Sequence, residues 1–304
     1  MNPRKIQPPF LKNGDEVAII SPSFYIDEKL LIEAVAFLEK WGLRVRLGKN
    51  ASKRSGPFAG SDEERLSDIQ EITDDPEIKA VFCSRGGYGL LKIIDKVNFS
   101  ALNKYPKWYS GFSDITVLHM WLNEVCGVMS IHSEMALNFN NVKKTDDTIK
   151  SLKNALFGDL RIHEWTGPVY KSGKVTGEVT GGNLSLLYSL SGTKAELSTE
   201  GKILIIEEIG EYYHHLDRML TSLKLSGKFD GLSALVIGGM IKIENTKIPW
   251  GKNVEETILG IVSEYSYPVF FNFPAGHIAD NRAFYIGKQA TMEVRANTSI
   301  LQYL

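Results

Sequence analysis

The feature that most constrains the fold is the alternation of strand and helix patterns in the first half of the 304-residue chain. Apolar runs at 16–23, 43–48 and 78–89 read as buried strands that enter loops. Helical patterns at 27–42 and 61–75 separate them, and the second opens with a serine followed three residues later by a glutamate, a capping signature. Repeated βα units of this kind predict a mainly parallel sheet covered on both faces, with sites beyond the carboxyl ends of the strands.

The second half of the chain shows a different pattern. Lys, Asp, Gly and Pro become frequent between about 140 and 174, which indicates a linker. Further strand candidates and a helix follow, and they favour a β-rich α/β domain: strands at 202–207, 232–239, 268–273 and 290–296, with the helix at 212–225. We therefore predict one domain at 1–155 and a second at 170–304.

Composition excludes several classes of protein. Lys and Arg number 35 against 36 Asp and Glu, and a net charge of -1 argues against a nucleic-acid or membrane-surface protein. No apolar run approaches the length of a transmembrane helix, and the N-terminus has no apolar core of a signal peptide. The two cysteines, Cys83 and Cys126, form no CxxC pair. These features predict a reduced, cytoplasmic protein.

Ser113 lies in the segment Gly-Phe-Ser-Asp, where an apolar strand candidate gives way to an amphipathic helix. Apolar residues at 115, 118, 122 and 125 place the start of that helix at or near Asp114. On this stretch alone, Ser113 or Asp114 reads most simply as an N-cap. The alternative is a nucleophile on a sharp turn, although Ile115 stands where a G-x-S-x-G elbow has its second glycine.

A glycine-rich turn follows the strand candidate at 78–83, with the sequence Ser-Arg-Gly-Gly-Tyr-Gly at 84–89. Paired glycines let backbone N–H groups approach a ligand, as phosphate loops and oxyanion holes require. Arg85 offers a fixed positive charge for a carboxylate or a phosphate. A tight turn into the predicted helix at 89–97, with an exposed arginine, is an equally good interpretation of this spacing.

The second half supplies the residues that could activate a nucleophile. Glu207 and Glu208 end one apolar strand candidate, and His277 follows another in a glycine-flanked loop. Neighbouring strand residues face opposite ways, so only one glutamate can point into a given cleft. Neutral histidine is the usual base for a serine nucleophile, and a carboxylate can fix its tautomer. A plain loop histidine and solvated strand-end charges are the alternative.

The remaining histidines show no pattern typical of a metal site. Neither an H-E-x-x-H motif nor a Cys/His cluster is present, so we predict no metal. His119 falls inside the helix that follows Ser113 and reads as a packed or half-exposed helix residue.

Taken together, seven segments resemble the LD-carboxypeptidase family, cytoplasmic serine peptidases of murein recycling that include the microcin C immunity peptidases. The segments lie in the family's order at 19–23, 58–69, 84–89, 111–116, 181–187, 206–220 and 273–277, with Asn281 behind the last. The resemblance implies a flavodoxin-like or Rossmann-like N-terminal domain that carries the nucleophile. It also implies a β-rich C-terminal domain that carries the acid and the base.

The resemblance also implies a role for individual residues. The catalytic serine maps to Ser113, the glutamate to Glu207 and the histidine to His277. Backbone N–H groups of Gly87 and Asp114 would form the oxyanion hole.

The implied activity is a metal-free and cofactor-free Ser-His-Glu peptidase that removes the terminal D-alanine from murein tetrapeptides. Arg85 is a candidate for binding the terminal carboxylate of the substrate, and a homodimer is expected. Two departures from the family stand out: Ser133-Glu134-Met135 replaces Gly-Pro-Met, and Glu208 replaces the usual aspartate, so that two glutamates compete for one assignment. A microcin-type peptidase acting on a nucleotide analogue, and a binding module without chemistry, are the rival hypotheses.

Overall fold

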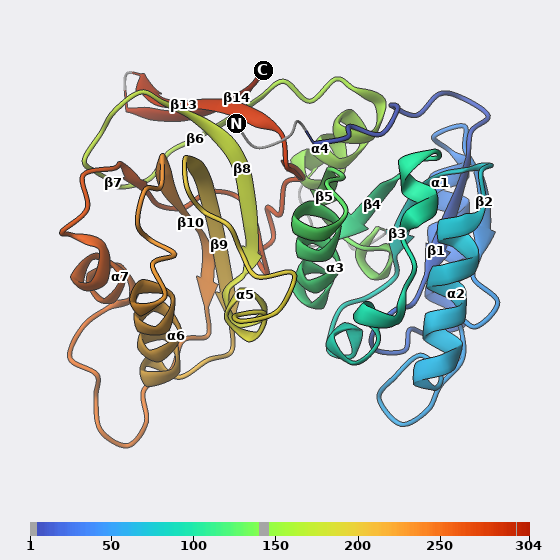
Figure 1. Ribbon diagram of the computed structural model, residues 1–304, viewed down its shortest axis with the longest axis horizontal. Coiled ribbons are helices and arrows are strands. Elements are labelled where there is room, and N and C mark those ends of the chain that lie inside the picture. Colours follow the sequence, from blue (N-terminus) through green and yellow to red (C-terminus); the bar gives the residue numbers. More distant parts are fainter. Residues whose placement is uncertain (1–4, 140–145, 296) are drawn as a thin grey trace. The chain divides into compact units, whose positions relative to one another are not determined.

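The computed structural model of the chain describes residues 5–139, 146–295 and 297–304 (Figure 1). The chain divides into two compact units. Unit 1 comprises Met1–Leu160 and Ala279–Gly287, and unit 2 comprises Arg161–Ile278 and Lys288–Leu304.

Unit 1 contains a six-stranded sheet with the order β12-β5-β4-β3-β1-β2. Every pairing is parallel except that of β12 with β5. The predicted parallel α/β class is therefore confirmed for the first half of the chain. The strands are β1 (Glu16–Ile20), β2 (Arg44–Leu47), β3 (Ile78–Cys83), β4 (Trp108–Gly111), β5 (Ser130–His132) and β12 (Phe284–Ile286).

The helices of unit 1 follow the predicted pattern in part. They are α1 (Glu28–Glu39), α2 (Asp62–Asp74), α3 (Thr116–Met120) and α4 (Asp146–Phe157). The capping box of α2 is confirmed, because Ser61 and Glu64 each bond the backbone N–H of the other. The helix predicted at 89–97 is wrong. Two short 3-10 segments, η1 (Leu90–Lys92) and η2 (Ile94–Lys96), occupy that stretch.

The polypeptide between the predicted domains is structured rather than a linker. Helix α4 and the strands β6 (Ile162–Trp165) and β7 (Val169–Tyr170) lie in it, while residues 140–145 are outside the described part of the chain. The contiguous second domain expected at 170–304 also differs from the observed division, because Ala279–Gly287 belongs to unit 1. The physical reason is long-range pairing: β12 adds antiparallel to β5, with Phe284 opposite His132.

Lys107, the residue before β4, hydrogen-bonds the carboxyl end of α2. Its ammonium group donates to the carbonyl oxygens of Ile72, Thr73 and Asp75, at 2.8, 2.9 and 2.6 Å. These acceptors would otherwise be unsatisfied at the helix end. Burial of the ammonium group lowers the pKa of Lys107 to about 8. The start of β4, the strand that leads to Ser113, is thereby attached to α2.

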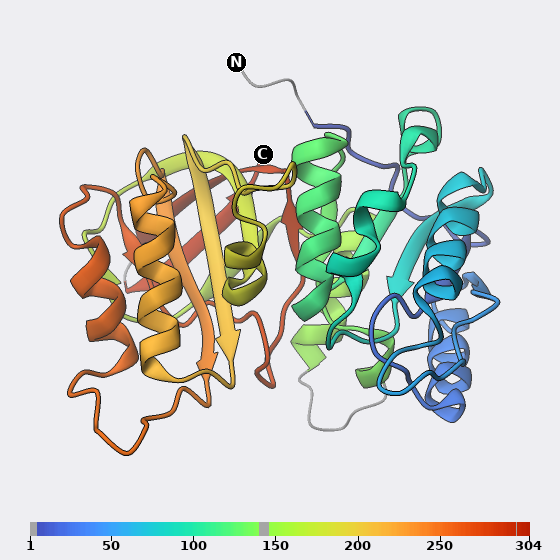
Figure 2. The same cartoon turned by 60° about the horizontal axis from the view of Figure 1, so that its bottom comes forward.

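Unit 2 contains an eight-stranded mixed sheet with the order β6-β14-β13-β8-β9-β10-β11-β7. The strands β8, β9, β10 and β11 run parallel to their neighbours in that block, and the outer pairings are antiparallel. In Figure 2 the helices of this unit lie on one face of its sheet. The further elements are β8 (Val175–Asn183), α5 (Leu184–Ser189), β9 (Lys202–Ile209), α6 (Tyr213–Leu225), β10 (Ala234–Ile241), α7 (Val254–Val262), β11 (Val269–Phe270), β13 (Gln289–Arg295) and β14 (Thr298–Tyr303).

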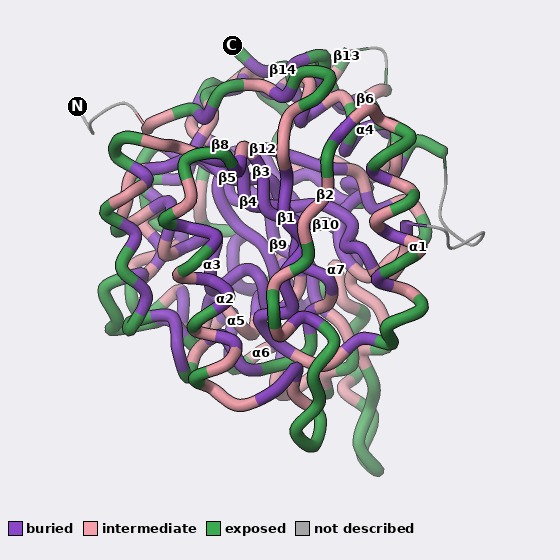
Figure 3. Tube along the Cα trace, turned by 90° about the vertical axis from the view of Figure 1, so that its right-hand side faces the viewer, coloured by how far each residue is buried: buried purple, intermediate pink, exposed green. Residues whose placement is uncertain are grey.

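The central strands of each sheet form the cores. Figure 3 shows β1, β3, β4 and β9 as largely buried segments. In β9, burial extends from Lys202 to Glu208, so both glutamates are enclosed rather than solvated. In the described part of the chain, no helix has the length and apolarity needed to cross a membrane.

Candidate active site

Ser113 occupies a strained turn directly after β4. Its φ is +63°, in the left-handed region that non-glycine residues rarely adopt. The 3-10 segment η4 (Ser113–Ile115) starts here with Phe112 in the N-cap position, and no side chain caps it. The N-cap interpretation of Ser113 or Asp114 is therefore wrong. A half-buried serine held in a left-handed turn is the geometry typical of a nucleophile elbow.

The helix after Ser113 is irregular, and one of its residues holds the turn. In place of the single helix expected from the sequence, the structure has η4, then α3, then a π-helical segment η5 (Trp121–Val125). His119 of α3 is fully buried, and burial lowers its pKa to about 4, so the ring is neutral. Its Nε2–H donates to the carbonyl oxygen of Gly111 at 2.8 Å, and Nδ1 accepts from Ser130 Oγ at 2.9 Å. His119 thus anchors the strand end two residues before Ser113.

Asp114 connects the Ser113 turn to the glycine-rich turn. Its Oδ2 accepts a hydrogen bond from Ser23 Oγ at 2.6 Å and one from the N–H of Leu90 at 3.1 Å. The carboxyl group is fully buried, and that burial raises its pKa. Because Leu90 directly follows the glycine-rich turn, one side chain fixes both loops relative to each other.

The glycine-rich turn passes against Ser113, and its glycines are required for this. A Cβ built on Gly86 would lie 2.9 Å from Ser113 Cβ and 3.1 Å from Ser113 Oγ. Gly87 has a φ of +109°, and a Cβ there would lie 2.3 Å from a ring carbon of Phe24. Larger residues could not follow this path without displacing their neighbours. Two predicted site regions, 84–89 and 111–116, therefore meet within unit 1.

Arg85 extends from the same turn and is partly fixed by the backbone. One guanidinium N–H donates to the carbonyl oxygen of Tyr25 at 3.0 Å, and the guanidinium carbon lies 5.9 Å from the ring centroids of Phe24 and Tyr25. The side chain is half-buried rather than a free surface arginine. Such a planar, oriented cation suits a carboxylate.

Unit 2 contains a histidine–carboxylate pair. His277 Nδ1 and Glu207 Oε2 are 2.8 Å apart, with Glu207 1% exposed and the His277 side chain 19% exposed. A carboxylate accepts here, so Nδ1 carries the proton, and Nε2 is the basic nitrogen of the neutral ring. Gly276 permits the contact: its φ is +103°, and a Cβ there would lie 2.6 Å from Glu207 Oε2.

Glu208 points the other way and has a separate set of partners. It accepts from Asn183 Nδ2 at 3.0 Å, from the N–H of Ser185 at 2.7 Å and from its own neighbour Ile209 N–H at 2.8 Å. Burial raises the pKa of Glu208 to about 7, against the effect of these donors. Because Ser185 lies in the first turn of α5, Glu208 supports that helix. Glu207 is the glutamate that contacts the histidine.

Glu134, which marks a departure from the family pattern, is also buried and fully engaged. Its Oε1 accepts from the N–H of Met135 at 3.1 Å and from Asn138 Nδ2 at 2.9 Å. Its Oε2 faces Asn281 Nδ2 at 3.4 Å. A carboxylate in place of a proline is thus accommodated by amide donors, one of them from the returning segment Ala279–Gly287.

The predicted site residues form two groups, one in each unit. Ser113, Asp114, Gly87 and Arg85 lie together in unit 1, and Glu207 and His277 form the pair in unit 2. Sequence reasoning missed His119 and the linking role of the Asp114 side chain, because neither contact leaves a local signal. Across the described residues, no group of three or more His, Cys, Asp or Glu side chains could hold a metal ion.

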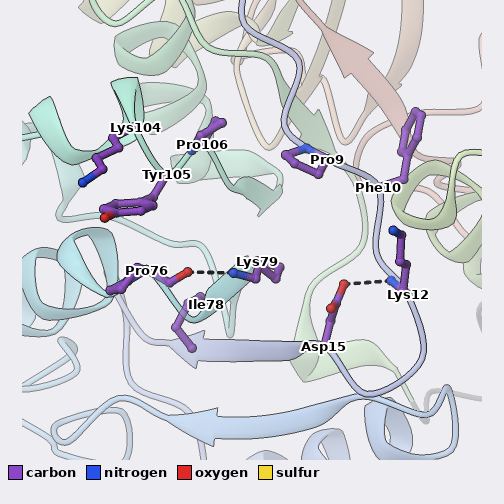
Figure 4. Close-up of a pocket in the computed structure, with 10 residues that line it drawn as sticks. All are labelled: Pro9, Phe10, Lys12, Asp15, Pro76, Ile78, Lys79, Lys104, Tyr105 and Pro106. Carbon is purple, nitrogen blue, oxygen red and sulfur yellow. Dashed lines mark hydrogen bonds between the residues drawn. The ribbon is translucent and has the colours of Figure 1, made fainter.

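A pocket at the opposite, amino-terminal edge of the unit 1 sheet contains none of these residues (Figure 4). It has a volume of about 300 Å³ and is lined by lysines, prolines and two aromatic rings. Lys79 Nζ donates to the carbonyl oxygen of Pro76 at 2.7 Å, and the N–H of Lys12 donates to Asp15 at 2.8 Å (Figure 4). Its lining has no histidine and no serine, and we assign it no catalytic role.

Known proteins match this chain over nearly its whole length. Residues 17–133 match the LD-carboxypeptidase N-terminal domain, and residues 176–292 match the LD-carboxypeptidase C-terminal domain. The "Probable murein peptide carboxypeptidase" of Bacillus subtilis is 34% identical over 97% of this chain and 94% of the relative. The "Murein tetrapeptide carboxypeptidase" of Pseudomonas aeruginosa is 32% identical over 91% of this chain and 92% of the relative.

Solved structures with the same fold include two kinds of protein. Muramoyltetrapeptide carboxypeptidase from Oxalobacter formigenes has a TM-score of 0.87 and 28% identity, covering 95% of this chain and 98% of that chain. MccF in complex with glutamyl sulfamoyl guanosine has a TM-score of 0.87 and 21% identity, covering 99% of this chain and 98% of that chain. At that identity the likeness to MccF concerns the fold alone.

Proposed function

The chain is a serine carboxypeptidase of the LD-carboxypeptidase family, and we propose that it releases the terminal D-alanine of murein tetrapeptides through Ser113, His277 and Glu207. The names of two relatives above 30% identity support the substrate class, since both refer to murein peptides. The hydrogen bond between His277 and the buried Glu207, at 2.8 Å, is the observation that carries the mechanism.

In the proposed reaction, Ser113 Oγ attacks the carbonyl carbon of the bond between the L-diamino acid and D-alanine. The serine proton moves to His277 Nε2, which is basic because Nδ1 donates to Glu207. His277 then gives that proton to the departing D-alanine nitrogen as the C–N bond breaks. A water molecule, deprotonated by the same histidine, cleaves the acyl-enzyme and restores Ser113. The buried Glu207 carboxylate stabilises the imidazolium that forms in each half-reaction.

Backbone N–H groups of Gly87 and Asp114 are the proposed donors to the oxyanion. Gly86 and Ser113 are in contact, and Asp114 accepts from Leu90, so the two donors belong to loops that are fixed to each other. Donors that are held in place before the reaction stabilise the developing charge without reorganisation. Loss of one typically lowers the rate by roughly 10²–10³-fold. Arg85 would bind the terminal carboxylate of D-alanine.

The direct test is to incubate the protein with a murein tetrapeptide and measure D-alanine release by chromatography. Wild type should release one D-alanine per peptide. Ser113→Ala and His277→Ala should be inactive yet retain the wild-type circular dichroism spectrum and melting temperature. A fluorophosphonate probe should transfer its phosphonyl group to Ser113 in wild type, with loss of fluoride, and should do so more slowly in His277→Ala. Undiminished release by Ser113→Ala would refute the mechanism, and no release by wild type would refute the substrate assignment.

An aminoacyl nucleotide analogue is the second candidate substrate for the same chemistry, because the chain shares its fold with MccF, which was solved in complex with glutamyl sulfamoyl guanosine. The identity of 21% is lower than that of either murein peptidase, and we therefore favour the murein substrate. Parallel assays with a tetrapeptide and an aminoacyl sulfamoyl nucleotide decide between them. We also propose a cytoplasmic role in murein recycling and a homodimer. Cell fractionation tests the first, and light scattering at twice the chain mass tests the second.

A further inference from the structure

A second cavity lies in unit 2, at the carboxyl end of β10. Its volume is about 310 Å³, in the lower range for small-ligand sites. Its lining combines four partly exposed apolar residues with the exposed Asn272 and glycine backbone; the apolar residues are Met240, Ile241, Val254 and Ile278. Among the described residues that line it, Glu255 alone carries a charge.

This cavity shares its backbone with the histidine–carboxylate pair. Ile278 directly follows His277, and a Cβ built on Gly239 would lie 2.7 Å from Ile278 Cγ2. The N–H of Gly239 donates to the carbonyl oxygen of Ala275 at 2.8 Å. A Cβ on Gly238, which also lines the cavity, would lie 3.4 Å from Glu207 Cβ. A substrate group in the cavity would therefore lie beside the catalytic loop.

Glu255 is available to a ligand, whereas its neighbour is not. Glu256 closes the capping box of α7 by accepting from the N–H of Asn253 at 2.8 Å. Glu255 is half-buried in the first turn of the same helix and makes no hydrogen bond or ion pair to any residue within the described ranges. The helix dipole favours a carboxylate at this position, but it leaves the acceptor sites of Glu255 unused.

We propose that this cavity binds an unbranched aliphatic side chain that ends in an ammonium group. The inference rests on the proposed murein peptidase function, in which such a chain is L-lysine at the third position, beside the scissile bond. Apolar walls accept the methylene groups, and the Glu255 carboxylate pairs with the ammonium group. A side chain that ends in both an amine and a carboxylate, as in meso-diaminopimelate, would bring a second anion toward Glu255 without a cation in the lining to balance it.

The test compares kcat/KM for three tetrapeptides that differ only in the third residue: L-lysine, norleucine and meso-diaminopimelate. Wild type should prefer lysine to norleucine by about tenfold, the size expected for one charge-assisted hydrogen bond. Glu255→Gln should remove that preference by lowering kcat/KM for the lysine peptide to the value for the norleucine peptide. Glu255→Lys should raise diaminopimelate above lysine. Glu256→Gln, one residue away and outside the cavity, should keep the wild-type preference.

Equal rates for lysine and norleucine peptides, or an unchanged ratio in Glu255→Gln, would overturn the subsite while D-alanine release still supported the proposed function. No release from any peptide would refute the function instead. In that case the subsite is judged by calorimetric binding of the lysine and norleucine peptides to Ser113→Ala, with and without Glu255→Gln. A preference for the lysine peptide that depends on Glu255 would support the proposed subsite, and equal binding of the two peptides would refute it.

Discussion

The substitutions Glu207→Gln and Glu208→Gln make the same chemical change at two adjacent residues of β9, and we expect different effects on activity. In Glu207→Gln, the amide oxygen can still accept from His277 Nδ1 at the observed 2.8 Å. The amide nitrogen takes the place of Oε1, which is buried and has no hydrogen-bond partner among the described residues, so the fold should lose about 1–3 kcal/mol of stability. The negative charge that stabilises the imidazolium is gone. The same carboxylate-to-amide change in a serine peptidase triad lowers kcat by about 10⁴-fold, because the amide no longer holds the histidine in the productive tautomer, and we expect a decrease of roughly 10³–10⁴-fold here.

Glu208→Gln should affect stability but not the chemistry, because Glu208 does not contact His277. The amide oxygen can replace Oε1, which accepts from Asn183 and Ile209, but the amide nitrogen then faces the N–H of Ser185 in place of Oε2. A buried donor without an acceptor costs about 1–3 kcal/mol. We therefore expect Glu208→Gln to be destabilised by about that amount at pH 5 and to retain kcat within about threefold.

The dependence of stability on pH is a second, independent test of the burial of Glu208. The pKa of Glu208 rises from 4.5 to about 7 on folding, so the folded state binds the proton more tightly than the unfolded state. The stability from this linkage is complete below pH 4.5 and is lost as the pH rises through 7. A pKa difference of about 2.5 at about 1.4 kcal/mol per pKa unit gives about 3.5 kcal/mol as an upper value. The stability gap between wild type and Glu208→Gln should therefore narrow toward pH 8.

Urea unfolding at pH 5 and pH 8, together with kcat for D-alanine release, measures both effects. Each variant serves as the control for the other, because the chemical change is identical. An inactive Glu208→Gln that is fully folded would refute the assignment, as would an active Glu207→Gln. A stability gap that widens between pH 5 and pH 8 would contradict the burial argument for Glu208.

Three further changes test the loops around Ser113. Asp114→Ala leaves the donors of Ser23 and Leu90 without their buried acceptor and should cost about 2–5 kcal/mol in urea unfolding, while Asp114→Asn, which keeps an acceptor, should stay within about 1 kcal/mol of wild type. Gly87→Ala must tolerate a φ of +109° and a clash with Phe24, so kcat should fall at least tenfold with KM changed less. The pKa of Lys107 falls from 10.5 to about 8 on folding, so the unfolded state binds more protons and the stability of wild type rises with pH. Between pH 8 and pH 10, wild type should therefore gain about 2 kcal/mol over Lys107→Met in denaturant titrations. No gain would contradict the burial of that ammonium group.

Much of unit 1 could be predicted because its signals are local. The alternation of apolar runs and helical patterns between 16 and 83 reports which residues are buried and with what period, and that suffices for a parallel α/β sheet. The capping box at Ser61 and Glu64 is likewise local, since both partners lie within one turn. Predictions for short stretches were wrong where the periodicity was ambiguous. At 89–97, for example, a glycine precedes two 3-10 segments rather than a helix.

The residue types of the candidate site, the family and the class of fold could be recognised from the amino-acid sequence. The three-dimensional structure was needed to find that Ser113 adopts a left-handed turn and that Glu207 rather than Glu208 contacts His277. It also decided that residues 279–287 return to the sheet of unit 1. Each of these depends on partners far away in the chain. Local periodicity states that a side chain is buried, but not which side chain lies opposite, and hydrogen-bond geometry depends on the latter.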